Sequence, residues 1–113
     1  MEGTIIKKEW ISLILSGKKT MEVKSQYKPL KGQRIALGYG SLVRGYAKVK
    51  EVVSIPYNDI PKYQHLHLAT TWLMNHYKGK DVVYGYVLED VIVENEQVPY
   101  SRSYGWVWFS IPF

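Results

Sequence analysis

The sequence predicts a mainly β protein of the α+β class, with about six strands and two helices in a single domain. Alternation of apolar and polar residues, which is typical of strands, recurs along most of the chain. Apolar residues follow helical spacing in only two segments. The length of 113 residues fits one domain, residues 1–113. A hydrophobic fraction of 46 % excludes a disordered chain and is enough for a core.

The two predicted helices cover residues 8–16 and 67–77. Both have an apolar face, and Gly17 follows the first one directly, as expected for a glycine that ends a helix. Trp10 lies on the apolar face of the first helix and Trp72 on that of the second. We interpret both tryptophans as packing residues.

The predicted strands cover residues 4–6, 20–24, 34–39, 45–53, 82–93 and 104–111. Pro56 and Pro61 bracket a loop that follows the predicted strand 45–53 and breaks the sheet pattern. In the segment 20–24, Glu22 and Lys24 share one strand face, and the apolar residues between them face the core. We expect a mostly antiparallel sheet that forms a small closed barrel, with helices over its ends, because closure removes exposed strand edges.

The composition excludes several classes of protein. The chain has no cysteine, so it has neither a disulfide partner nor a thiolate metal site. No apolar run reaches the roughly 20 residues of a membrane helix, and no basic, apolar leader begins the chain. We therefore expect a cytoplasmic monomer without membrane association. No glycine-rich phosphate loop is present, so we expect no cofactor.

The charge is distributed unevenly along the chain. Residues 1–50 carry 11 Lys and Arg against 3 acids, whereas residues 51–113 carry 4 against 7. A basic half of this kind attracts polyanions, which favours a nucleic-acid partner. The alternative is an ordinary solvated basic face.

The segment 16–24 contains three ionisable side chains where a helix ends and a strand begins. Lys19 lies at the turn, and Glu22 and Lys24 follow on one strand face. A carboxylate between two ammonium groups stays ionised and orients both. This trio can bind phosphate, hydrogen-bond a base edge or transfer a proton. The alternative is a surface ion-pair cluster of little consequence for stability.

The same segment resembles the opening of ASCH domains, whose hallmark is Gly-x-Lys-x-x-Glu-x-Arg. Gly17, Lys19 and Glu22 match that motif, and Lys24 stands where the family usually has Arg. Lys keeps the charge but lacks the bidentate fork of Arg. The similarity extends to the predicted strands at 32–37, 45–49 and 84–90 and to the closing segment 98–106.

The resemblance implies a PUA-like β-barrel with the motif in a cleft. Members of the family are proposed RNA binders, some of them coactivator modules. A few small bacterial members are similar to enzymes, namely amidohydrolases acting on N4-acetylcytidine and a ribonuclease. The amidohydrolases use a Lys, a Thr and a Glu. Lys19 matches the Lys, but Glu22 occupies the Thr position, and residues 62–77 contain no acid. Lys19 and Glu22 remain the candidate catalytic pair of a ribonuclease or amidohydrolase.

Aromatic residues interleaved with cations favour single-stranded RNA or a nucleotide-like ligand, because bases stack on rings while cations hold phosphates. The residues predicted to bind it are Lys18, Lys19, Glu22, Lys24, Tyr27, Tyr39, Arg102 and Tyr104. We interpret Trp106 and Trp108 as core residues of the last strand. A protein-interaction module is a third possible function.

The three histidines remain without an assigned role. His65, His67 and His76 could add imidazole chemistry to the cleft. We favour the alternative that the pair His65 and His67 is a solvated loop feature. A metal would need a third ligand beside the pair, and no spacing in the sequence provides one.

Overall fold

A single curled sheet of six strands forms the centre of the molecule. The structure is a computed structural model that describes residues 1–102 and 105–112. The strands are β1 (Glu2–Ile5), β2 (Met21–Lys24), β3 (Arg34–Tyr39), β4 (Leu42–Pro56), β5 (Val82–Val93) and β6 (Trp108–Ser110). Their order is β2-β5-β4-β3-β1-β6, so β2 and β6 are the edges. The sheet is a half-barrel of the PUA-like type rather than the closed barrel expected from the sequence.

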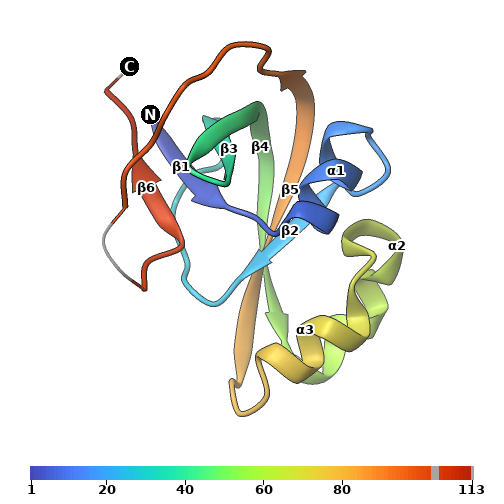
Figure 1. Cartoon of the computed structure of the whole chain (residues 1–113). Helices are drawn as coiled ribbons and strands as arrows, with labels where there is room; N and C mark the ends of the chain where they lie inside the picture. The colour runs from blue at the N-terminus through green and yellow to red at the C-terminus, as the bar shows by residue number, and fades with distance from the viewer. Residues whose placement is uncertain (103–104, 113) are drawn as a thin grey trace.

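All strand pairs are antiparallel except β1 and β3, which run parallel. Figure 1 shows the long strands β4 and β5 running through the middle of the molecule, with β6 on one side of them and the helices on the other. Strands β3 and β4 are joined by a two-residue turn at Gly40 and Ser41, both with positive φ (62° and 66°). Positive φ at both central positions matches the twist of antiparallel strands.

The helices are α1 (Lys8–Leu15), η1 (Tyr57–Tyr63, a 3₁₀-helix), α2 (Gln64–His67) and α3 (Thr70–His76). The first helix ends at Gly17 with φ +83°, as the sequence predicts. The loop predicted between Pro56 and Pro61 is instead the 3₁₀-helix. Among the described residues, no helix has the length and apolarity required to cross a membrane.

The helix predicted over residues 67–77 begins at Thr70, as α3, and a separate short helix, α2, precedes it and ends at His67. The chain breaks at Leu68, which adopts the left-handed conformation (φ 59°) between α2 and α3. The sequence does not predict this break, because the apolar spacing is helical and the segment contains no glycine or proline, the residues that usually interrupt a helix. The last strand is also shorter than predicted: it begins at Trp108, and residues 103 and 104 lie outside the described part of the chain.

Apolar side chains from α1, β3, β4, β5 and β6 form the largest core cluster, which includes Ile14, Leu37 and Trp108. A second cluster joins β2 to η1 and α3 through Met21, Ile60 and Leu73. Trp106 is 56 % exposed, so its prediction as a core residue is wrong, whereas Trp108 is buried as predicted. The short β2 contributes to the second cluster and is buried along its whole length.

Candidate functional site

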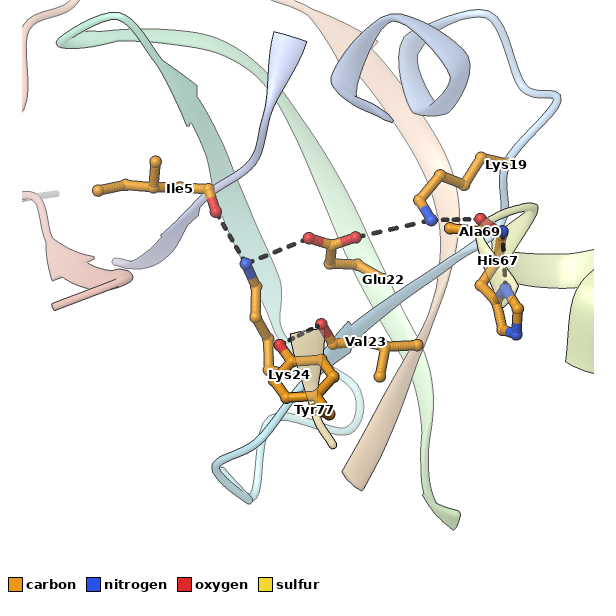
Figure 2. A network of polar contacts seen from close by, with 8 residues as sticks. All are labelled: Ile5, Lys19, Glu22, Val23, Lys24, His67, Ala69 and Tyr77. Carbon is orange, nitrogen blue, oxygen red and sulfur yellow. Dashed lines mark hydrogen bonds and ion pairs between the residues drawn. The ribbon is translucent and has the colours of Figure 1, made fainter. Parts of the chain in front are cut away.

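A row of charged groups extends along β2 between β1 and α2. Met21 and Val23 point into the core, as the alternation predicts, so Glu22 and Lys24 point to the opposite face. Lys19 reaches the same face from the turn after α1. One Glu22 oxygen lies 3.2 Å from the Lys24 ammonium and the other 3.8 Å from the Lys19 ammonium. Figure 2 shows the carboxylate between the two ammonium groups.

Backbone carbonyls complete the row at both ends. The Lys24 ammonium donates to the Ile5 carbonyl of β1 at 2.8 Å, and the Lys19 ammonium donates to the His67 carbonyl of α2 (Figure 2). A carbonyl in the last turn of a helix has no partner within the helix, so it is free to accept. The break at Leu68 therefore supplies the acceptor that holds Lys19.

All three ionisable side chains are buried, so the alternative of a solvated surface cluster is wrong. Lys19 is 2 % exposed, and its ammonium lies 5.3 Å from the ring centroid of Trp10. Burial lowers the pKa of Lys19, and Lys24 lowers it further, while the carboxylate of Glu22 raises it. Lys19 is thus easier to deprotonate than a solvated lysine.

The ring of His67 fixes the carbonyl to which Lys19 donates. This side chain is fully buried, so its interpretation as part of a solvated loop is wrong. Nδ1 accepts from the Ala69 backbone at 3.0 Å, and Nε2 lies 2.8 Å from the Ile60 carbonyl. The neutral ring with a proton on Nε2 satisfies both contacts. Burial lowers the pKa of His67, and the positive charges of Lys19 and His65 act in the same direction.

A cavity of about 690 Å³ opens over this row. Its volume falls within the range of sites for small molecules. Five of the residues predicted to bind ligand line it: Lys19, Glu22, Lys24, Tyr39 and Arg102. They come from β2, the end of β3 and the segment before β6, so the fold brings together residues far apart in the sequence.

Two of the residues predicted to bind ligand lie elsewhere. Lys18 is exposed and does not line the cavity. Tyr27 is also exposed and packs edge-on against Tyr84, with ring centroids 5.5 Å apart. Tyr104 lies outside the described residues, so its role stays a prediction.

The cavity also has lining residues outside the set predicted to bind ligand. Trp10 and Trp72 pack against the core, as predicted, and in addition they line the cavity. Lys7, His76 and Tyr100 line it as well. The four-residue spacing of Trp72 and His76 places both on one helix face, but ordinary packing residues have the same spacing, so the sequence alone does not identify them as cavity residues.

The charge of the cavity is strongly positive. Among the described lining residues, four are lysines or arginines and only Glu22 is acidic. The cationic residues are Lys7, Lys19, Lys24 and Arg102. Such a wall attracts anions, and low-dielectric surroundings strengthen the attraction.

The six-stranded half-barrel has the fold of ASCH domains. Solved structures of the ASCH protein of Zymomonas mobilis are similar to this chain. A serine-to-alanine variant has a TM-score of 0.74 and 21 % sequence identity over 81 % of this chain and 69 % of that one. The protein without that substitution has a TM-score of 0.73 at 21 % identity, over 81 % and 68 % of the two chains. The likeness confirms the fold that the sequence motif predicts. No protein-family model and no curated protein matches the sequence.

Proposed function

We propose that this chain is an ASCH-family protein that binds single-stranded RNA or a nucleotide-like ligand in the cavity above β2. The observation that carries the proposal is the buried Lys19–Glu22–Lys24 row on a cationic, aromatic-lined cavity. Buried charges cost free energy of folding unless they are well paired. A row of three at the base of a cavity is therefore more readily explained by ligand recognition than by stability.

The row offers both kinds of hydrogen bond that a base or ribose needs. Each ammonium has three hydrogens, and Lys24 uses two of them on Glu22 and Ile5. The carboxylate of Glu22 accepts hydrogen bonds and is 10 % exposed. A ligand that enters the cavity thus meets an acceptor flanked by donors.

Equilibrium binding of a fluorescently labelled single-stranded RNA tests the proposal. We expect Lys24→Gln to weaken affinity about tenfold, because a charged hydrogen bond contributes about 1.5 kcal/mol. The matched control is Lys48→Gln, a lysine of β4 that does not line the cavity. Affinity for the wild-type protein should also fall steeply with salt. Unchanged affinity in a folded Lys24→Gln variant would contradict the proposed site.

A hydrolase in the same cavity is the second candidate, and the lowered pKa of Lys19 favours it. In its neutral form, Lys19 would accept the proton of an attacking hydroxyl. Purified protein incubated with single-stranded RNA and with N4-acetylcytidine, and analysed for products, tests this activity. Turnover that Lys19→Ala abolishes would identify a ribonuclease or an amidohydrolase. Binding without turnover would leave the binding function alone.

A further inference from the structure

One wall of the cavity is an aromatic stack. The rings of Trp72 and His76 lie one helical turn apart on α3, with centroids 4.5 Å apart and planes 15° from parallel. Trp10 meets Trp72 edge-on at 6.3 Å. All three residues line the cavity. The wall is therefore built from flat rings that approach from two helices.

Packing of α3 against the core accounts for only part of this stack. Leu73 is 3 % exposed and belongs to the second core cluster, and Trp72 contacts that cluster with part of its ring. His76 is exposed, and Trp72 is only half-buried. A half-exposed indole with an exposed imidazole on it offers a flat surface to the cavity. Heteroaromatic bases stack on such surfaces without regard to sequence.

Two further cationic side chains, Lys7 and Arg102, lie on the cavity wall. The Lys7 ammonium lies 5.6 Å from the ring centroid of Trp72. The Arg102 guanidinium donates to the Trp106 carbonyl at 2.8 Å. The neighbouring Val107 carbonyl accepts from the Ile5 backbone, so this cation lies beside the chain that leads to Lys7.

These two cations differ from the two lysines at the base of the cavity. In the described part of the chain, no carboxylate lies within 4.0 Å of Lys7 or Arg102. Lys19 and Lys24 already share Glu22. An anionic group of a ligand is therefore better matched to Lys7 and Arg102, while the row below them suits neutral polar atoms.

We infer that the ligand is a nucleoside monophosphate unit whose base stacks on Trp72 and His76 and whose phosphate contacts Lys7 and Arg102. This inference rests on the proposed function and deepens it. The polar edge of the base faces the Lys19–Glu22–Lys24 row. The unit is either a free mononucleotide or one nucleotide of a single-stranded RNA, since both carry the same base and phosphate.

Binding measurements with three small ligands distinguish the contacts of the base from those of the phosphate. Cytidine 5′-monophosphate has base and phosphate, ribose 5-phosphate lacks the base, and cytidine lacks the phosphate. We expect Trp72→Leu to weaken monophosphate binding about tenfold to hundredfold and to leave ribose 5-phosphate binding unchanged. Lys7→Gln should weaken binding of both phosphates and spare cytidine. Tyr27→Leu, an exposed aromatic residue outside the cavity lining, is the control.

A second pair of variants guards against misfolding of Trp72→Leu. His76 is exposed, so its replacement leaves the core intact. We expect His76→Ala to weaken monophosphate binding and His76→Phe to retain it, because phenylalanine keeps a ring for the stack. Quenching of tryptophan fluorescence by the monophosphate should be lost in Trp72→Leu and kept in Tyr27→Leu.

The results distinguish failure of this inference from failure of the proposed function. If the Trp72, His76 and Lys7 variants bind as the wild type does while Lys24→Gln loses affinity, the stacking wall is wrong and the proposed cavity stands. If no ligand binds and Lys24→Gln leaves RNA affinity unchanged, both are wrong. Competition between the monophosphate and an eight-nucleotide RNA identifies the source: tighter binding of the RNA assigns the unit to RNA, and equal binding assigns it to a free nucleotide. Either assignment requires the loss in Trp72→Leu.

Discussion

Two ion pairs of this protein have the same length and opposite surroundings. Lys24 and Glu22 lie 3.2 Å apart, with side chains 9 % and 10 % exposed. Lys31 and Glu51 also lie 3.2 Å apart, with side chains 67 % and 49 % exposed. Water screens the second pair, so it contributes at most about 1 kcal/mol to stability. The first pair is shielded from water, so each of its charges depends on the other.

The comparison shows that distance alone does not measure what an ion pair does. The buried carboxylate serves a second ammonium as well, that of Lys19. Removing it leaves two positive charges facing each other in a poorly solvated place. Removing the exposed carboxylate leaves a lysine in water. Three substitutions sharpen this difference, from the largest effect to the smallest.

The largest effect is expected for Glu22→Gln. The amide keeps the shape of the side chain but no longer neutralises Lys19 and Lys24, so the free energy of unfolding should fall by about 3 kcal/mol. Glu51→Gln is the control and should change it by less than about 1 kcal/mol. Urea denaturation followed by circular dichroism measures both. Equal losses in the two variants would show that burial does not distinguish the pairs.

Replacing the whole row by apolar residues should not lower the free energy of unfolding, in contrast to Glu22→Gln. A triple variant with Lys19→Met, Glu22→Leu and Lys24→Met removes all three buried charges together, and such replacements are often neutral or stabilising. The same variant should lose affinity for RNA. A more stable protein that no longer binds would show that the row serves the ligand at the expense of stability. A triple variant as unstable as Glu22→Gln would contradict this.

The smallest effect concerns His67, the buried residue whose carbonyl ends the row. Its pKa is lowered from 6.5, chiefly by burial. Between the lowered value and 6.5, the unfolded chain therefore binds more protons than the folded protein. Stability is then fully present above pH 6.5 and falls as the pH decreases through that window, by about 1.4 kcal/mol per pH unit.

Thermal unfolding of the wild type and His67→Gln between pH 7.5 and 5 measures the contribution of this histidine. We expect the wild type to lose more stability than the variant over the acid half of the range. A glutamine cannot gain a charge there, whereas His67 must either stay neutral or lose its bond from Ala69. Parallel pH profiles would show that His67 is not the titrating group.

The sequence predicts the parts of the fold that local patterns specify. Residues 34–39 and 82–93 are strands with the predicted bounds, because alternation and turn residues define them. Leu68 escaped prediction because its left-handed conformation depends on tertiary contacts, among them those of His67. The sequence could group Lys19, Glu22 and Lys24 because all three lie within one short segment, residues 19–24, which forms a turn and a strand.

The rest of the site could not be derived from the chain. Trp10, Trp72 and His76 have the helical spacing of ordinary packing residues, and only the arrangement of α1 and α3 around β2 turns them toward a cavity. Burial of Lys19 is equally invisible in the sequence, since a lysine after a glycine turn is most often solvated. Long-range placement, rather than local preference, produces these features.

The position of β2 at the edge of the sheet has a consequence for association between chains. An edge strand exposes backbone groups to which another chain can add a strand. Here the Tyr77 hydroxyl donates to the Val23 carbonyl at 3.2 Å, and Lys24 ties the end of the strand to β1. Both side chains also line the cavity. The Tyr77 and Lys24 side chains thus also protect the edge of the sheet from strand addition. Variants that lack them should expose the backbone of β2, to which another chain could add a strand and aggregate.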